Sequence, residues 1–200
     1  MSPKAHIIDD DEAIRDALTW LLESRGVSCA SWTSAEAFLK AWNDSGESLQ
    51  GCLLLDIRMD GMSGLELFEH LQSRGLKLPV IFLTGHGDVP MAVSSLKRGA
   101  FDFVEKPFND NELVNRVIEA MDTDARNQEK QAINASVQTR LDTLTSRERQ
   151  IMELILVGKF NKVIADELQI SMRTVEVHRA HLFEKMGVRT AVELAQLLKP

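Results

Sequence analysis

Several positions in the first 120 residues carry side chains that could hold a divalent cation and accept a phosphoryl group. Each ends a stretch with the pattern of a β-strand: the adjacent acids Asp9, Asp10 and Asp11, then Asp56, Thr84 and Lys106. Crowded carboxylates repel one another, and Mg²⁺, which prefers oxygen ligands, relieves that repulsion. A carboxylate beside Mg²⁺ can attack phosphorus while a lysine and a hydroxyl hold the phosphoryl oxygens. These residue types predict a phosphoryl-accepting aspartate, Asp56, beside a magnesium site.

These side chains can meet only if the stretches before them are strands of one sheet. Strands are expected at 6–9, 27–32, 52–56, 79–84 and 101–105. Helical patterns lie between and after them: 12–25, a helix opened by a capping box at 33–36, 65–71, a helix from a cap at Asp88 to Gly99, and one capped by Asn109. This alternation predicts an α/β fold, a parallel sheet with helices on both faces. Ligands of such sheets lie beyond the carboxyl ends of the strands.

Each of these residues has a simpler interpretation when it is taken alone. An aspartate that ends a strand often caps a turn, and three acids before a helix can merely complement its dipole. A Lys-Pro pair such as Lys106-Pro107 usually forms a turn. The phosphoryl-accepting site is favoured because all of these residues stand at strand ends of one predicted sheet.

The carboxy-terminal part of the chain has only helical patterns. Residues 1–121 form the first predicted domain, residues 122–140 a polar, partly helical linker, and residues 141–200 an all-α four-helix domain. Capping boxes at 145–148 and 190–193 open two of its helices, and Asn161 and Ser171 open the others. The short helix, tight turn and longer helix within 161–186 are typical of a helix-turn-helix, which places its second helix in the major groove of DNA.

Composition and charge agree with two small globular domains. The chain has 200 residues, of which 44% are hydrophobic and 26% charged. No apolar run reaches the ~18 residues of a membrane span, and the start lacks a signal sequence, so we expect a cytoplasmic protein. Cys29 and Cys52 lie in apolar runs and are expected to be buried thiols. Residues 1–120 hold 11 Lys and Arg against 19 Asp and Glu, whereas residues 140–200 hold 10 against 8.

Specific motifs make the chain resemble two known families. Residues 4–121 resemble the receiver domain of two-component response regulators through five motifs: Ile7-Ile-Asp-Asp-Asp11, Leu54-Leu-Asp-Ile-Arg-Met59, Gly61-Met-Ser-Gly64, the stretch 83–93, and Lys106-Pro-Phe108. Residues 141–198 resemble the LuxR-type helix-turn-helix through three motifs: 144–150, Asn161-Lys-Val-Ile-Ala165, and 173–179. The layout is similar to FixJ-type members of the NarL/FixJ group.

The resemblance implies a role for each residue of the pocket. It implies a flavodoxin-like, doubly wound sheet of five strands in the order 2-1-3-4-5. Asp56 is then the phosphoryl acceptor, Asp10 a direct Mg²⁺ ligand, Asp9 a ligand through water, and the Arg58 carbonyl a further ligand. Thr84 and Lys106 bind the phosphoryl oxygens, and the Lys106-Pro107 bond is cis. The chain departs from the family at two positions, since Asp60 replaces a usual Pro, and Phe103 replaces a more frequent Tyr at the switch position.

A switch that links the pocket to dimerisation is also expected. When Asp56 is phosphorylated, Thr84 moves toward the phosphoryl group and Phe103 fills the space that it leaves. The 89–105 face then pairs across a two-fold dimer. Its polar positions are Ser94, Lys97, Arg98, Asp102 and Glu105.

The expected DNA contacts lie in the helix-turn-helix. Residues expected to reach base edges are Arg173, Glu176, Val177 and Arg179, together with Ala180, and residues expected to reach phosphates are Lys162, Thr174, His178 and Lys185. His178 and His181 are spaced as helix-borne metal ligands, but no Cys or carboxylate completes such a site.

The expected function is a transcription regulator and not an enzyme. The expected partners are a sensor histidine kinase, promoter DNA, RNA polymerase and a second copy of the chain, with Mg²⁺ as cofactor, no membrane, and activation as the outcome. An aspartyl-phosphate phosphatase of haloacid-dehalogenase type is an alternative, although the sequence Asp56-Ile-Arg58 lacks that family's second acid. A protein-interaction relay is another, against which the helix-turn-helix argues.

Overall fold

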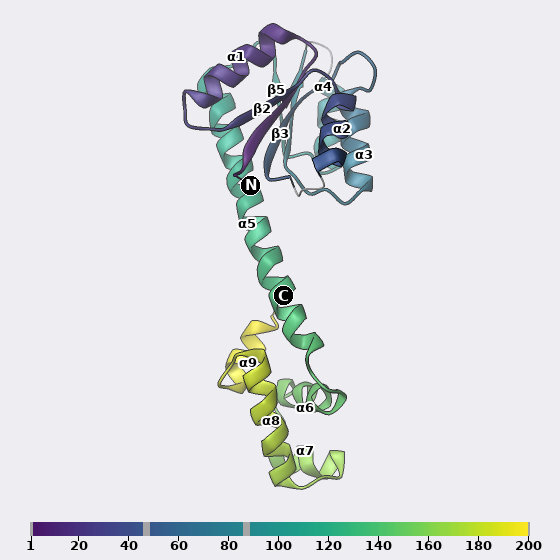
Figure 1. The fold of residues 1–200 in the computed structure, drawn as a ribbon, viewed down its shortest axis with the longest axis vertical. Helices are drawn as coiled ribbons and strands as arrows, with labels where there is room; N and C mark the ends of the chain where they lie inside the picture. The colour runs from purple at the N-terminus through teal and green to yellow at the C-terminus, as the bar shows by residue number, and fades with distance from the viewer. Residues whose placement is uncertain (1, 46–48, 86–88, 200) are drawn as a thin grey trace. The chain divides into compact units, whose positions relative to one another are not determined.

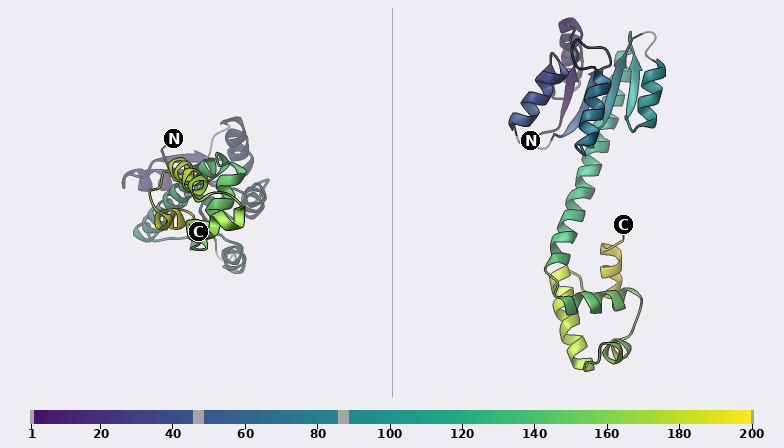
Figure 2. Two further views of the ribbon diagram at one scale, coloured as in Figure 1. Left: turned by 90° about the horizontal axis from the view of Figure 1, so that it is seen from below. Right: turned by 90° about the vertical axis from the view of Figure 1, so that its right-hand side faces the viewer.

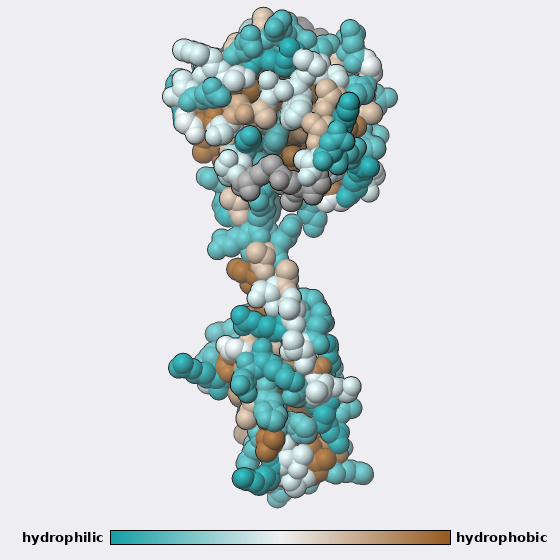
Figure 3. Space-filling model, in the orientation of Figure 1, coloured by the Kyte–Doolittle hydropathy of each residue, from teal (hydrophilic) through white to brown (hydrophobic). Residues whose placement is uncertain are grey.

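A computed structural model describes residues 2–45, 49–85 and 89–199, without the side chains of residues 89–92. The chain divides into two compact units, residues 1–128 and 129–200. Hydrophilic residues cover most of the visible surface of both, with separate apolar patches (Figure 3).

A five-stranded parallel sheet organises the first unit. Its strands are β1 (Lys4–Ile8), β2 (Cys29–Trp32), β3 (Gly51–Asp56), β4 (Val80–Thr84) and β5 (Asp102–Glu105). They are hydrogen-bonded in the order β2-β1-β3-β4-β5, and every pair is parallel. The predicted strands and their order are therefore confirmed.

Five helices connect or follow the strands: α1 (Glu12–Glu23), α2 (Ala35–Ser45), α3 (Gly64–Ser73), α4 (Val89–Lys97) and α5 (Asp110–Asp142). Helices lie on both faces of the sheet (Figures 1 and 2). One apolar cluster joins the sheet to α2 and α3, with Phe38 and Phe82 among its fully buried side chains. A second cluster joins it to α1 and α5 through residues such as Leu22 and Leu113. All six residues of β3 are buried, because this strand is covered on both faces.

Local hydrogen bonds explain where these helices begin. The Asp11 carboxylate accepts from the Ala13 backbone N–H at the start of α1. Asn109 caps α5 as predicted, because its side-chain oxygen accepts from two backbone N–H groups of the first turn. The predicted cap of α2 at Thr33 is wrong by one residue, since Ser34 Oγ accepts from the Ala37 N–H instead. The predicted cap at Asp88 lies outside the described residues.

Helix α5 extends well past the residues that it buries against the sheet. It is 33 residues long, and its buried residues end at Asp124. The polar stretch 122–140, which we expected to be helical in part, is helical throughout. Polar composition alone does not stop a helix, because this stretch contains neither Gly nor Pro.

The second unit packs short helices around one apolar cluster. Beyond the end of α5 it contains α6 (Ser146–Leu156), α7 (Asn161–Leu168), α8 (Met172–Met186) and α9 (Ala191–Leu197). Ile151, Ile164, Val175 and Leu182 are fully buried between them. The predicted capping box at Thr145 is present, and Gly187 ends α8 in the left-handed conformation. In the described part of the chain, no helix has the length and apolar character needed to span a bilayer.

Candidate functional site

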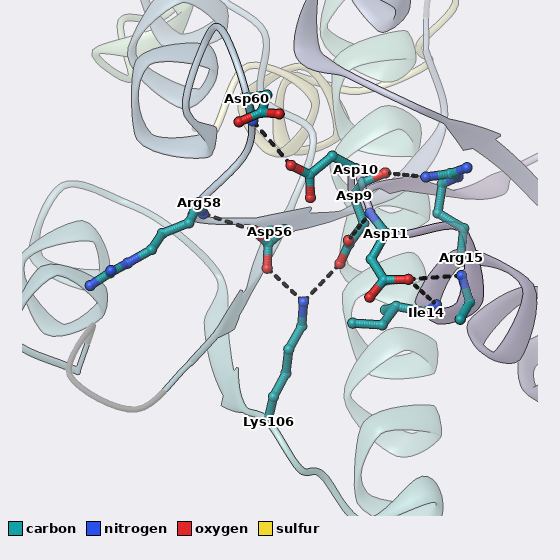
Figure 4. A network of polar contacts seen from close by, with 10 residues as sticks. Asp9, Asp10, Asp11, Ile14, Arg15, Asp56, Arg58, Asp60 and Lys106 are labelled. Carbon is teal, nitrogen blue, oxygen red and sulfur yellow. Dashed lines mark hydrogen bonds and ion pairs between the residues drawn. The ribbon is translucent and has the colours of Figure 1, made fainter.

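The carboxyl ends of β1 and β3 place two carboxylates against the amine of Lys106, which follows β5. Lys106 Nζ donates to Asp56 Oδ1 at 2.6 Å and to Asp9 Oδ2 at 2.8 Å (Figure 4). Both aspartates are buried, with relative exposures of 7% for Asp56 and 1% for Asp9. Parallel pairing of β1 with β3, and of β3 with β4 and then β5, brings these strand ends to the same edge of the sheet.

The charges of this cluster are not balanced. Two carboxylates share one ammonium, which leaves an excess negative charge. Burial raises the pKa of Asp56, and the nearby Asp9 adds to that effect, although Lys106 opposes it. Burial also disfavours the charged form of Lys106, but its hydrogen bonds to both carboxylates outweigh burial and raise its pKa. The cluster therefore favours the binding of a further cation.

Backbone and side-chain donors hold the two carboxylates in place. Asp56 Oδ2 accepts from the Arg58 N–H at 2.8 Å, and Asp9 Oδ1 accepts from the Asp11 N–H at 2.9 Å. Arg15 Nη1 donates to the Asp9 carbonyl at 2.7 Å, a contact that we did not predict. Arg15 lies on the first turn of α1, six residues after Asp9, and this spacing was the signal available in the sequence.

Asp10, which was also predicted to bind Mg²⁺, is placed differently from Asp9 and Asp56. The exposed Asp10 points toward the loop after β3, where its Oδ2 accepts from the Asp60 N–H at 3.1 Å (Figure 4). Among the described residues, no three acidic, histidine or cysteine side chains converge as a metal site would require. The structure thus brings Asp9 and Asp56 together at Lys106 and directs Asp10 elsewhere.

The donor set nevertheless suits a magnesium ion. Asp9 and Asp56 offer only oxygen atoms and carry more negative charge than Lys106 neutralises. Mg²⁺ prefers oxygen ligands and retains several waters, so two carboxylates and a carbonyl are enough to hold it.

Thr84, at the end of β4, has an unsatisfied hydroxyl. Its side chain is fully buried, and its Oγ1 has no hydrogen-bond partner among the described residues. A buried polar atom without a partner costs about 1–3 kcal/mol, so a ligand oxygen that reached it would be stabilised.

Phe103 pairs with Phe82, two residues before Thr84 on the neighbouring strand. Residues two apart share a face, so Thr84 and Phe103 lie on one face of the sheet. The predicted Lys106-Pro107 cis bond is present.

The predicted dimer face has polar residues in two different situations. Ser94 and Lys97 are exposed on α4. Arg98 instead forms an ion pair with Glu69 of α3 at 2.6 Å, and Asp102 pairs with Arg116 of α5 at 2.6 Å. To pair across a dimer, Arg98 would have to release Glu69, and Asp102 would have to release Arg116.

The predicted recognition helix exposes part of the expected surface. Arg173, Glu176 and Val177 are exposed on α8, and Lys162 is exposed on α7. Val177 shows 46% of its surface, which is large for an apolar residue. These side chains are free to reach bases or phosphates.

The other predicted DNA residues are partly engaged within the domain. Thr174 Oγ1 lies 2.8 Å from Ser171 Oγ, and the half-buried Arg179 stacks on the Phe183 ring with 5.2 Å to its centroid. His178 is also half-buried. Lys185 Nζ donates to Glu148 Oε2 at 2.7 Å and to the Thr143 carbonyl at 3.2 Å, so its ammonium holds α8 to the start of α6.

Two family models match separate parts of the chain. Residues 5–118 match the response regulator receiver domain. Residues 142–198 match the bacterial regulatory proteins of the luxR family. The first match covers the sheet together with Asp9, Asp56 and Lys106, and the second covers α6 to α9.

Proteins similar to the whole chain are also found. The C4-dicarboxylate transport transcriptional regulatory protein DctR of Rhodobacter capsulatus is 50% identical over 200 residues, which cover 98% of this chain and 100% of that protein. The transcriptional regulatory protein FixJ of Azorhizobium caulinodans is 45% identical, over 96% of this chain and 90% of that protein. The solved structure of response regulator StyR has a TM-score of 0.89 at 35% identity and covers 99% of this chain and 98% of its own.

Proposed function

Because the chain belongs to the two-component response regulators that join a receiver domain to a LuxR-type DNA-binding domain, we propose that a phosphoryl group on Asp56 controls its binding to promoter DNA. The observation that carries this proposal is the placement of the buried Asp56 carboxylate against Lys106, with the unsatisfied hydroxyl of Thr84 ending the adjacent strand β4. A sensor histidine kinase and promoter DNA are the partners that this family membership implies.

The chemistry of the pocket is the transfer of a phosphoryl group to one oxygen of Asp56. That oxygen forms a bond to phosphorus, the bond from phosphorus to the kinase histidine breaks, and the imidazole leaves with the electron pair. Lys106 then exchanges part of its contact with Asp56 for the phosphoryl oxygens, and the Thr84 hydroxyl donates to another of them. Neither residue loses a proton in this step.

Magnesium would be held by Asp56, Asp9 and the Arg58 carbonyl, with Asp10 joining if it leaves the Asp60 N–H. Its chemical contribution is to neutralise charge on the phosphoryl oxygens as they approach two carboxylates. The protein's own contribution is to hold Asp56 in position, through the Arg58 N–H on one oxygen and Lys106 on the other.

The response to phosphorylation begins at Thr84. We expect this residue to move toward the phosphoryl group and Phe103 to fill the vacated space, because both lie on one face of the sheet. The 89–105 face then forms a homodimer. Two copies of the DNA-binding unit double the contacts with DNA, and this steepens the salt dependence of binding.

The DNA surface that we propose consists of Lys162, Arg173, Glu176 and Val177, with Thr174, His178 and Arg179 at its edge. Lys185 is left out because Glu148 and Thr143 already hold its ammonium. The bound dimer activates transcription through contact with RNA polymerase.

Radiolabelled acetyl phosphate with Mg²⁺ tests the assignment of Asp56. The Asp56→Ala variant should take up no label, whereas Asp44→Ala, which changes an exposed aspartate of α2, should take it up like the unaltered protein. Equal labelling of the Asp56→Ala variant would overturn the proposal. Sedimentation of the labelled protein as a monomer at micromolar concentration would overturn the dimer.

A further inference from the structure

The last buried residue of helix α5 is an acid, Asp124. The inward face of the helix carries Leu113, Val114, Val117, Ala120 and finally Asp124, and no residue from there to Asp142 is buried. Asp124 is only 6% exposed. The last inward contact of α5 is therefore made by a carboxylate, although every earlier one is apolar.

Two hydrogen bonds, both to uncharged donors, hold this carboxylate. Asp124 Oδ2 accepts from the Gly51 backbone N–H at 2.8 Å and from Gln128 Nε2 at 2.6 Å. No ion pair involves Asp124 among the residues that the structure describes. Burial raises the pKa of Asp124, against the effect of both hydrogen bonds. A buried acid without a cation disfavours its own ionisation, so a purely packing role would be served better by an apolar residue.

Gly51, the partner of Asp124, is fixed in its own position. Its φ angle is +113°, and a Cβ atom there would lie 2.0 Å from the Lys4 carbonyl oxygen. Only glycine fits at this point, where β1 and β3 begin to pair. Gly51 is also the first residue of β3, the fully buried strand whose last residue is Asp56. The hydrogen bond thus ties α5 to one end of the strand that carries the phosphoryl acceptor at its other end.

The packing on either side of this bond is open. A hollow of about 440 Å³ borders Thr123 and Asn127 on one side of α5. A second hollow of about 440 Å³ borders Met121 and Asp122. At 100° per residue these two pairs lie on opposite sides of the helix, with Asp124 between them on the inward face. Met121 still packs against the second apolar cluster. Asp124 is the last buried residue of α5, and its hydrogen bond to Gly51 holds this end of the buried face to β3.

We propose that Asp124 is a positioning residue that anchors the departing end of α5 to the start of β3. Through this anchor, a change in β3 when Asp56 is phosphorylated also changes the position of α5. Helix α5 continues toward the DNA-binding unit, so the change reaches that unit. The anchor lies within the first unit. Its coupling to DNA binding rests on the proposed function, because it presumes that phosphorylation of Asp56 controls DNA binding.

Three substitutions separate the hydrogen bond from the burial of a side chain. Asp124→Ala and Asp124→Leu remove the acceptor, and the leucine restores buried volume. Asp124→Asn keeps an acceptor oxygen for Gly51 and removes the charge. Asp122→Ala changes an exposed acid two residues earlier on the same helix and serves as the control.

Hydrogen exchange of the full-length variants tests the anchor. The Gly51 amide and the amides of residues 121–130 should exchange at least about 10-fold faster in the alanine and leucine variants. The asparagine and control variants should stay within about twofold of the unaltered protein. Unchanged exchange of Gly51 in the leucine variant would overturn the anchor, whether or not the alanine variant folds.

DNA binding with and without acetyl phosphate tests the coupling. The ratio of the two affinities should fall to about one in the alanine and leucine variants and be rescued in the asparagine variant, while labelling of Asp56 proceeds at the normal rate. A leucine variant that keeps the ratio of the unaltered protein would overturn the coupling. A ratio of one in the unaltered protein would instead count against the proposed function and leave the exchange result standing.

Discussion

The two units each contain a lysine bound to a buried carboxylate, yet the two pairs differ in what surrounds them. Lys106 of the receiver lies 2.6 Å from Asp56 and 2.8 Å from Asp9. Lys185 of the DNA-binding unit lies 2.7 Å from Glu148. By distance alone the pairs are equivalent.

The donors around each acid distinguish them. Glu148 accepts from the Thr145 N–H as well as from Lys185. Burial opposes its charge, but these hydrogen bonds outweigh burial and lower the pKa of Glu148. The pKa of Asp56 is raised, because burial and the charge of Asp9 outweigh Lys106. A balanced pair with a lowered acid pKa is typical of a structural contact, whereas the acid excess at Asp56 favours cation binding.

The largest effect expected from this contrast is on phosphoryl transfer. Lys106→Met should slow labelling of Asp56 by acetyl phosphate at least about 100-fold, because a fixed charge near the transferring oxygens is lost. Lys40→Met removes an exposed lysine of α2 and should leave the labelling rate unchanged. Normal labelling of the Lys106 variant would show that the Lys106–Asp56 pair has no more part in phosphoryl transfer than the Lys185–Glu148 pair.

Removal of the other lysine should affect stability instead. Lys185→Met leaves Glu148 buried without its cation, so the free energy of unfolding of the second unit should fall by about 1–3 kcal/mol. Hydrogen exchange of amides in α6 and α8 measures this change. Asp56 labelling should not change.

Lys162 provides the matched comparison in the same unit, because it is exposed on α7. Lys162→Met should weaken DNA binding and change stability by less than about 0.5 kcal/mol. If the Lys162 variant lost as much stability as the Lys185 variant, the exposure of a lysine would not distinguish a DNA contact from a structural contact in this unit.

A smaller effect is expected at the edge of the pocket. Asp60→Pro removes the N–H that holds Asp10, whereas Asp60→Ala keeps that N–H and removes the same carboxylate. The proline variant should bind Mg²⁺ about 3- to 10-fold more tightly than the alanine variant, because Asp10 becomes free to act as a ligand. Calorimetric titration of the two proteins measures the difference, and equal affinities would show that the Asp60 N–H does not restrain Asp10.

The smallest effect concerns acid stability. The pKa of Glu148 is lowered in the folded chain, so its contribution is present above the ordinary glutamate pKa of 4.5 and is lost as the pH falls through the lower, folded value. The second unit should therefore lose stability below about pH 4.5, and Glu148→Gln should flatten that loss. Hydrogen exchange at several acidic pH values reports on this unit. All three tryptophans lie in the receiver, so their fluorescence follows that unit separately. An unchanged slope in the Glu148→Gln variant would contradict the role given to this residue.

Much of the fold was predictable because its signals are local. Apolar runs located all five strands, and Asn109, Thr145 and Ser171 marked helix starts that the structure confirms. The motifs also identified both families, which the matches over 5–118 and 142–198 confirm. Local signals were ambiguous where adjacent residues could serve equally, as with the cap of α2, which is Ser34 and not Thr33.

The order of residues along the chain establishes which side chains end the strands and are therefore available to the pocket. Which of these side chains contact one another depends on the folded chain: Lys106 contacts Asp9 across 97 positions of sequence, while Asp10 accepts from the Asp60 N–H. The same holds for the contact of Lys185 with Glu148 and of Asp124 with Gly51. Periodicity and capping act over a few residues, so they cannot indicate such contacts. Hydrogen bonds between distant residues depend instead on strand register and on the packing of whole helices.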